Sequence, residues 1–555
     1  MKKPSAAGLK RRCTSIRAWE IPKQSGGGLA PDHVWTNRDM DQTWTIWTIM
    51  AYWASNTIDL GAWETASGIL SVGLSWREAI PIMLVANLCV AIPLVLNGAM
   101  GAKLHVPFSV VTASSFGYYL RYFCIVSRAV LAMFWLGVQL TSSHDDDDDA
   151  RGANGAQCMT IMLRAWAPSY NNIPNTLPES AGITSVGMVS YLLFWLIQLP
   201  LLLVHPTRLK WVLLVKMICG PAAAIATMGW CIHKAGNGGD IFALKPTATG
   251  SDYSWLWLSC MSSVTGSWST LACNIPDFTR YAKSPKGQFI QLPFLPIAFT
   301  LCGVLGIVTT SCTKVFSGEY MWNPLQVLEL WLEYGSGGRC AAFFVALAWY
   351  IAQVGTNITA NSISAANDLT VLFPRWVNIR RGCIIAAVIA GWVLVPWKIL
   401  TSASTFLAFM GGYAIFLGPM AGIMVADYWL IKKQHIDIPA LYDPRGRYAY
   451  TAGCNWRAVV AFLVPVGPLL PGLAFSVSGA PAVQINDGTK HLYTFNWLFG
   501  YVTSIFLYTV LSFTFPAKET LLHETVWDLE AAAVEAHPCG SDGESSPGAT
   551  AASSK

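Results

Sequence analysis

Apolar stretches long enough to cross a bilayer recur along most of the chain, separated by short polar segments. A membrane-spanning helix needs about 20 mostly apolar residues, and the pattern supplies twelve such stretches. The sequence therefore predicts an all-α integral membrane protein with about twelve transmembrane helices. One membrane domain, residues 44–516, follows a tail at 1–43 and precedes a tail at 517–555. The predicted spans are 45–70, 79–97, 117–140, 186–204, 211–232, 255–279, 294–316, 341–369, 382–400, 403–431, 456–477 and 493–515.

Two of these spans carry polar, helix-poor residues at mid-membrane depth. The first contains Ser-Asn-Thr-Ile-Asp-Leu-Gly at 55–61, and the sixth is rich in Ser at 259–269. Polar groups in hydrocarbon cost a few kcal/mol, so these residues face a cavity or another helix. They open two consecutive groups of five spans, a pattern typical of an inverted-repeat transporter whose first and sixth helices are broken around the cargo. Packing seams of small residues are the alternative explanation.

The charge distribution predicts the orientation. Most of the 36 Lys and Arg residues fall in segments on the same side as the N-terminus, which places both termini in the cytosol. Only 12% of residues are charged, about half the usual soluble content, which excludes a soluble protein. The net charge of +5 is spread over short loops, which argues against a nucleic-acid partner.

One acidic segment differs from the other loops. Residues 144–155 contain five consecutive Asp, Asp145–Asp149, and are predicted to form an extracellular insertion after the third span. A block of like charges repels itself and stays solvated, so we expect a disordered insertion rather than a divalent-cation site.

The chain shows no constellation of an enzyme. No nucleophile–base pair or phosphate-binding glycine loop is visible, and the 14 Cys residues lack metal-ligand spacing. We therefore expect no enzymatic activity, no metal and no other cofactor. Aromatic and amide side chains instead recur four residues apart, on one helical face, as in Trp135 with Gln139 and Asn357 with Asn361. Ring faces and amides are what a flat polar heterocycle requires, although each pair has an alternative as ordinary helix packing.

Several longer motifs occur in order along the chain. They are Tyr-Asn-Asn-Ile-Pro-Asn-Thr-Leu-Pro at 170–178, Asn-Ile-Pro-Asp-Phe-Thr-Arg-Tyr at 274–281, Gly-Thr-Asn-Ile-Thr-Ala-Asn-Ser at 355–362, Asn-Ile-Arg-Arg-Gly at 378–382, Gly-Pro-Met-Ala-Gly-Ile-Met-Val-Ala-Asp-Tyr at 418–428 and Tyr-Asp-Pro-Arg-Gly-Arg-Tyr at 442–448. Together they resemble nucleobase-cation symporter family 1, in its fungal branch of uracil, allantoin and uridine permeases. The resemblance runs from about Asn37 to the end of the last span, without the acidic insertion.

This resemblance implies a five-plus-five inverted repeat with broken first and sixth helices and two extra C-terminal helices. It also implies secondary active import of a nucleobase or ureide, such as uracil or allantoin, by symport and alternating access. Among the residues that match the family pattern, Trp135 would stack on one face of the substrate ring and Trp268 would cover the other. Gln139 and Asn361 would hydrogen-bond the edge of the ring. The tenth-span residues Phe409, Met410 and Tyr413 would narrow the entry path.

The resemblance also bears on the coupling ion. Sodium-using relatives coordinate the ion with first-helix carbonyls and an Ala…Ser-Thr set in the eighth helix, where this chain has Ala352, Gly355 and Thr356. The missing Ser hydroxyl leaves such a sodium site incomplete, and the fungal branch is usually proton-coupled, so the resemblance implies coupling to H⁺ rather than Na⁺, with Asp59 of the first helix as a further coupling candidate. The membrane-edge carboxylates Asp277 and Asp368 are alternative proton carriers, but they are expected to act as gate residues that pair with a nearby Lys or Arg.

The expected location is the plasma membrane, and the expected partners are the heterocyclic substrate, the lipid bilayer and the ubiquitin-ligase and endocytic machinery at the tails. A permease for uridine, thiamine or nicotinamide riboside is an alternative within the class. A non-transporting nutrient sensor is an alternative from another class, although a sensor would usually need longer structured tails than these.

Overall fold

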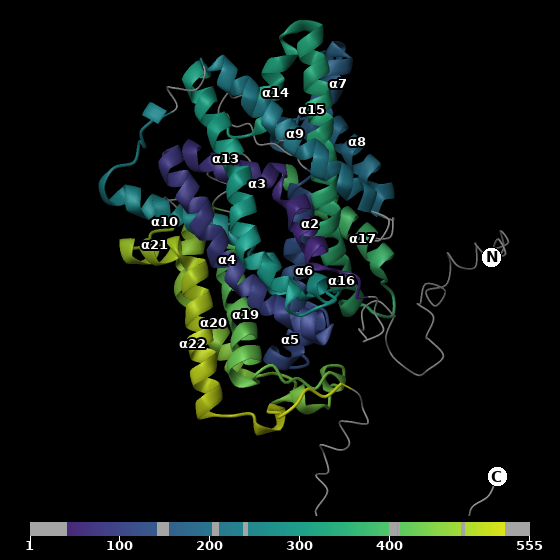
Figure 1. The fold of residues 1–555 in the computed structure, drawn as a ribbon, viewed down its shortest axis with the longest axis vertical. Coiled ribbons are helices and arrows are strands. Elements are labelled where there is room, and N and C mark those ends of the chain that lie inside the picture. The colour runs from purple at the N-terminus through teal and green to yellow at the C-terminus, as the bar shows by residue number, and fades with distance from the viewer. Residues whose placement is uncertain are drawn as a thin grey trace, which may run out of the picture.

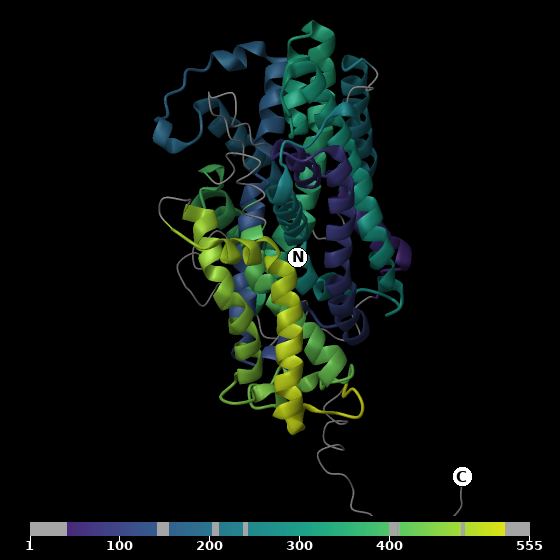
Figure 2. The same ribbon diagram turned by 90° about the vertical axis from the view of Figure 1, so that its left-hand side faces the viewer.

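The computed structural model describes residues 42–140, 155–202, 210–236, 242–398, 411–478 and 483–527, together with Ala408. These residues form a nearly all-helical, elongated bundle with no β structure beyond isolated bridges in the described part (Figures 1 and 2). Nine helical stretches among them are long and apolar enough to cross a membrane. Each coincides with one predicted span. The helices that cover the first, sixth and ninth predicted spans are too short or too polar to be among these nine, so the total of twelve stays a prediction.

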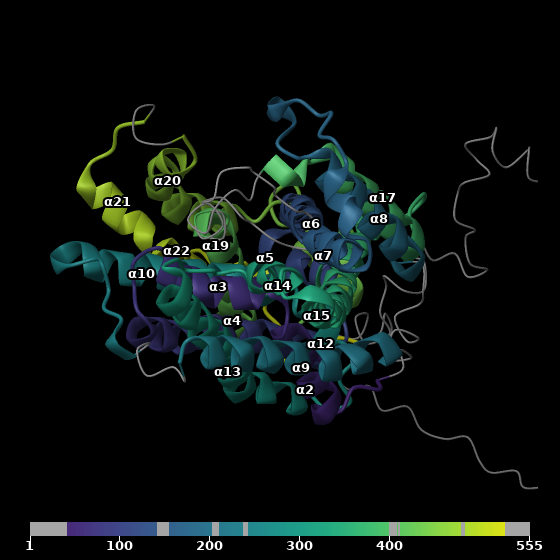
Figure 3. The same ribbon diagram turned by 90° about the horizontal axis from the view of Figure 1, so that it is seen from above.

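The N-terminal part of the bundle supplies the first set of helices. They are α2 (Ile46–Thr57), α3 (Leu60–Ser71), α4 (Trp76–Leu104), α5 (Phe108–Phe116), α6 (Arg121–Val138), α7 (Gly155–Trp166), α8 (Ser185–Leu202) and α9 (Lys210–Lys234). Figure 3 looks along the bundle and shows α4, α9 and the later helix α13 (Gln291–Ser317) on the side where α2 lies.

The remaining helices complete the bundle. They are α10 (Gly250–Ser267), α11 (Ser269–Asn274), α12 (Pro276–Thr279), α13 (Gln291–Ser317), α14 (Pro324–Leu332), α15 (Gly335–Thr356), η7 (Asn357–Ser362), α16 (Ile363–Leu372), α17 (Ile379–Val388), η8 (Ile389–Val393), α19 (Ala414–Val425), η10 (Ala426–Ile431), α20 (Trp456–Ser478), α21 (Asp487–Thr494) and α22 (Asn496–Thr514). Helices α20 and α22 stand beside α19 at one edge (Figure 1).

The two predicted helix breaks are present. In the first span, α2 ends at Thr57 and α3 begins at Leu60, with Ile58 and Asp59 in extended conformation between them. The Asp59 carboxylate accepts a hydrogen bond of 2.8 Å from the Ala62 N–H, which satisfies one of the free donors at the start of α3. In the sixth span, α10 ends at Ser267 and α11 begins at Ser269, after a non-helical Trp268.

The eighth span has an irregularity that the sequence did not predict. Residues Asn357–Ser362 form a π-helical segment, η7, between α15 and α16. Such segments widen the turn and occur frequently at functional sites. This one carries Asn361, a predicted substrate ligand.

The structure corrects the placement of the acidic insertion. Residues 141–154 lie outside the described part, but Gly155 does not belong to an outer loop as predicted: it begins α7, which is buried against α8 and α15. The Gly155 N–H donates to the Gln139 carbonyl at 3.3 Å. The chain therefore leaves the end of α6 and returns to the same helical turn, so α7 continues the third span and the insertion interrupts it. Periodicity missed this because the insertion separates the two halves of one helix.

Removal of twelve residues, 143–154, should restore a continuous third helix, because Gly155 then becomes the fourth residue after Gln139 and keeps its observed backbone partner. We expect a stability gain of about 1–2 kcal/mol from the lost loop-closure cost, with uptake retained. Thermal unfolding of the detergent-solubilised protein and uptake at equal surface amount measure both. Replacement of residues 143–154 by a Gly/Ser segment of the same length is the control, because it removes the acidic side chains and keeps the loop. Loss of uptake on deletion would contradict the continuous third helix.

A polar cluster fixes α5 at the end of the bundle opposite α14 and α15. The buried Asp427 carboxylate lies 2.8 Å from the Lys432 ammonium and accepts from Ser114 and Ser115 of α5, each at 3.0 Å, and from Tyr508 at 2.7 Å. Burial lowers the pKa of Lys432, and the facing Asp427 partly offsets the shift. The cluster matters because α5 also contacts the gate residues described below.

Candidate substrate-binding site

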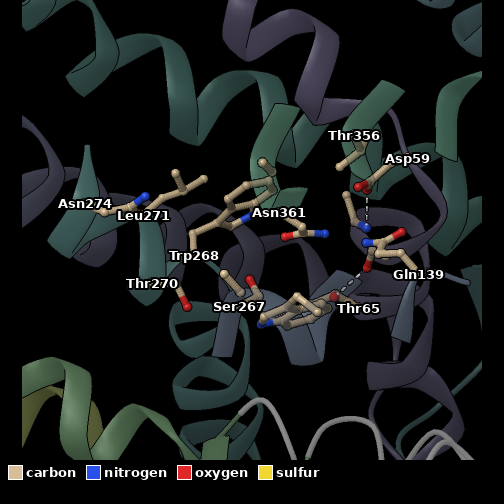
Figure 4. Close-up of a pocket in the computed structure, with 15 residues that line it drawn as sticks. Asp59, Thr65, Gln139, Ser267, Trp268, Thr270, Leu271, Asn274, Thr356 and Asn361 are labelled. Carbon is tan, nitrogen blue, oxygen red and sulfur yellow. Dashed lines mark hydrogen bonds between the residues drawn. The ribbon is translucent and has the colours of Figure 1, made fainter. Parts of the chain in front are cut away.

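A small pocket of ≈ 60 Å³ lies between the two helix breaks. A volume of this size admits only a few waters, so the site is narrow in this conformation. Figure 4 shows Asp59, Thr356 and Gln139 at one end of the pocket and Trp268 toward the other, with Asn361 between them. The lining residues are Asp59, Gly61, Ala62, Thr65, Ala132, Trp135, Gln139, Ser267, Trp268, Thr270, Leu271, Asn274, Thr356, Ala360 and Asn361.

Helix α6 contributes Trp135 and Gln139 from one face, as their spacing predicted. Both side chains are buried and line the pocket. The Gln139 Oε1 atom has no hydrogen-bond partner among the described residues, which leaves an acceptor for a ligand. Gly61 of α3 faces this amide, and a Cβ there would lie 3.6 Å from Gln139 Nε2. The Gln139 side chain and the α3 backbone at Gly61 therefore form one wall of the pocket.

Trp268 forms part of the opposite wall. Its ring packs against Phe299, with centroids 4.8 Å apart, and edge-on against Trp53 at 5.7 Å. Tyr413 does not line the pocket itself, but its ring meets Trp135 edge-on at 6.3 Å and its hydroxyl donates to the Gly266 carbonyl at 2.9 Å. It therefore braces one stacking residue and the sixth-helix break. Phe409 and Met410, the other two predicted tenth-helix contacts, lie outside the described residues.

A series of amides orients Asn361. Its Nδ2 donates to Asn357 Oδ1 at 3.1 Å, and Asn357 Nδ2 donates to the Leu136 carbonyl and to Gln198 Oε1, both at 3.3 Å. With its nitrogen engaged in this way, Asn361 keeps its oxygen as an acceptor toward the pocket. The arrangement suits a ring N–H donor.

The four cation-site candidates lie together, but a lysine occupies the space between them. The Lys216 side chain of α9 is 1% exposed, and its ammonium donates to the Thr356 hydroxyl. Its Cδ atom would be 2.8 Å from a Cβ at Gly355. Thr356 in turn donates to the Ala352 carbonyl at 3.2 Å, and Asp59 lies beside Thr356 (Figure 4). The Lys216 ammonium therefore engages the Thr356 hydroxyl, which is one of the expected cation ligands.

The substitution Gly355→Ser should lower uptake and should not introduce a sodium requirement. The new side chain would collide with Lys216 and push its ammonium from Thr356, but the lysine charge would still repel a second cation. Uptake measured in sodium and in choline buffers tests this, with Gly467→Ser as the control because nothing lies within 4 Å of a Cβ at that position. Sodium-stimulated uptake by Gly355→Ser would contradict the assignment.

Both gate candidates contact one buried arginine. Arg128 of α6 is completely buried and forms an ion pair with Asp368 of α16, while its Nη2 lies 4.0 Å from Asp277 Oδ2. Arg128 also donates to the Ser364 carbonyl at 2.7 Å, and Asp277 accepts from the Phe108 N–H of α5 at 2.9 Å. These contacts join the third, sixth and eighth spans and α5 on the side of the pocket that the charge pattern places toward the cytosol.

Asn274 connects the pocket with this ion-pair cluster. With its amide nitrogen donating to the Thr270 carbonyl at 2.8 Å, its oxygen accepts from Arg128 at 2.8 Å and from Ser364 at 3.2 Å. Asn274 also lines the pocket. A ligand in the pocket would therefore contact a residue that directly holds the gate.

The sequence matches a known family over most of its length. The family described as a permease for cytosine/purines, uracil, thiamine and allantoin matches residues 38–500. The chain belongs to this permease family. It is a multi-pass membrane transporter of the nucleobase-cation symporter group, and not an enzyme.

Individual relatives agree with this assignment. The permease is 37% identical to an uncharacterized permease of Schizosaccharomyces pombe, over 86% of this chain and 83% of that one. It is 29% identical to the allantoin permease of Saccharomyces cerevisiae, over 87% of this chain and 76% of the relative. Its fold matches that of a nucleobase-cation-symport-1 family transporter in a closed conformation with bromovinylhydantoin bound, with a TM-score of 0.67 at 20% identity over 88% of this chain and 97% of that one.

Two charged residues of the permease had no predicted role, Lys216 and Arg128. Both, like Arg121, are basic residues that fall within predicted spans. That position was the available signal, because an ionisable residue within a membrane span is by default a functional candidate. Their partners lie on other spans, so the sequence could not pair them.

Proposed function

We propose that this permease imports a small heterocyclic compound, a nucleobase or ureide such as uracil or allantoin, by proton symport. The observation that carries the proposal is one pocket that combines two tryptophans with two free amide acceptors, Trp135 and Trp268 with Gln139 and Asn361. A flat ring with N–H groups would stack between the two indole rings and donate hydrogen bonds to the two amide oxygens.

The coupling ion in this proposal is H⁺. A sodium site needs several free oxygen ligands, and here the Thr356 hydroxyl is engaged by Lys216. The lysine would replace a transported cation and leave the proton as the coupling ion. Binding of the substrate and proton from outside would precede closure, and opening of the Arg128–Asp277–Asp368 cluster would release them to the cytosol.

The proposal includes location in the plasma membrane with both termini cytosolic. The tails, which would meet the ubiquitin-ligase and endocytic machinery, lie mainly outside the described residues. A nutrient sensor would keep the same pocket without net transport, so an uptake measurement separates the two functions. Uridine, thiamine and nicotinamide riboside are the alternative substrates.

The test is uptake of radiolabelled uracil by permease-deficient yeast at pH 5 and pH 7, with excess unlabelled allantoin, uric acid, uridine or thiamine. We expect saturable uptake that falls as external pH rises, is blocked by allantoin and is indifferent to sodium. Cells that express Gln139→Ala, a variant without the free amide, serve as the matched control. Competition by uridine or thiamine alone would move the assignment to those substrates, and binding without uptake would favour the sensor.

A further inference from the structure

Glu64 is a buried carboxyl group next to the pocket. It lies in α3, five residues after Asp59, and is 1% exposed. The following residue, Thr65, lines the pocket, as do Gly61 and Ala62 of the same helix. The Glu64 Oε1 atom is buried without a hydrogen-bond partner, and no ion pair to this carboxyl exists among the described residues.

The other buried carboxylates of the described chain differ from Glu64, because each has a donor or a cation. Asp59 accepts from the Ala62 N–H, Asp277 from the Phe108 N–H, Asp368 pairs with Arg128, Asp427 with Lys432, and Asp437 with Arg447. These carboxylates are compensated as anions. Glu64 alone in this part of the chain has nothing that stabilises a negative charge.

The surroundings of Glu64 supply no cation either. The titratable groups that interact with it are the Asp59 carboxyl at the start of α3 and the Cys158 thiol of α7. Helix α3 packs against α4, α10, α13, α14 and α15, and none of their described residues places a Lys, Arg or His in ion-pair contact with it. The nearby Lys216 ammonium is bound to Thr356.

An uncompensated carboxylate inside a water-poor membrane protein is costly, by several kcal/mol. The closed site therefore accommodates Glu64 as the neutral acid, whereas water admitted on either side would allow it to ionise. Because Gly61, Ala62 and Thr65 of α3 line the pocket, one helix would contact a bound ring and also carry the carboxyl group of Glu64.

We propose that Glu64 carries the symported proton. A proton from the outer solution forms the carboxyl O–H bond while the site is open outward, the closed state holds the neutral acid beside the substrate, and the bond breaks to water when the site opens to the cytosol. Nothing is oxidised or reduced. The inference rests on the proposed proton symport and names its carrier.

The decisive variant is Glu64→Gln, which has the shape of the neutral acid and cannot release a proton. In proteoliposomes with an imposed inward proton gradient, we expect the wild type to accumulate labelled substrate severalfold above equilibrium and Glu64→Gln to reach equilibrium only. Exchange of internal for external substrate without a gradient should stay within about twofold of the wild type, which shows that the variant is folded and binds. Glu333→Gln, the same change at an exposed carboxyl, should leave accumulation unchanged.

The outcomes separate the two claims. A wild type that exchanges substrate but ignores the proton gradient overturns proton symport itself. A wild type that responds, together with a Glu64→Gln variant that still accumulates substrate, overturns only the role of Glu64. Glu64→Met, which keeps the length and leaves no buried polar atom, is the second variant if the glutamine variant fails to fold. Gradient-driven accumulation by Glu64→Met would equally overturn the proposal.

Discussion

Replacement of Trp135 by alanine is expected to abolish uptake at micromolar substrate, while the protein still reaches the cell surface. Trp135 lines the pocket and its indole is braced edge-on by Tyr413, with ring centroids 6.3 Å apart. Stacking of a nucleobase on an aromatic side chain contributes about 1–3 kcal/mol, so its loss should raise the dissociation constant by about 5- to 150-fold. Trp135→Phe, which keeps a smaller stacking face, should retain part of the affinity.

The measurement is saturation uptake together with equilibrium binding of labelled substrate to purified protein. Trp47→Ala removes the same side chain from an exposed position of α2, 74% accessible, and should match the wild type in both assays. An unchanged dissociation constant for Trp135→Ala would remove the stacking arrangement from the proposal. A lower maximal rate at constant affinity would assign Trp135 to the conformational step instead.

Replacement of Arg128 by methionine is expected to destabilise the folded protein by about 3–5 kcal/mol, the usual cost of a broken buried ion pair. The change would leave Asp368 without its cation and remove the positive charge near Asp277, and all three side chains are at most 2% exposed. Loss of the contact should also leave the cytosolic side poorly closed, so that uptake falls by more than tenfold at equal surface amount.

The double variant Arg128→Met/Asp368→Asn tests the reason for this effect. It removes the uncompensated charge at Asp368 along with the arginine, so it should recover much of the stability, measured as thermal unfolding in detergent. Uptake should stay low because the ionic contact between the third and eighth spans is still absent. Arg375→Met, at an exposed position, is the matched control. A single variant as stable as the wild type would show that the cluster does not hold the bundle closed.

Sequence reasoning was accurate where the information is local. Apolar periodicity located nine spans that the structure contains, and polar residues within spans located both helix breaks. Spacing of four residues placed Trp135 with Gln139, and Asn357 with Asn361, on common faces. These features depend on the 3.6-residue helical repeat and on the cost of polar groups in hydrocarbon, both of which act on a single segment.

Contacts between distant segments were not accessible in this way. Lys216 reaches Thr356 across 140 residues, Arg128 joins Asp277 and Asp368 from another span, and α7 resumes the third helix beyond the insertion. No local pattern specifies which partner a buried charge will have, because the pairing follows from how the helices cross. The sequence by itself determined a membrane transporter with broken helices and an aromatic–amide site. Only the tertiary structure decided that a lysine engages Thr356, an expected cation ligand, and that Glu64 has no partner among the described residues.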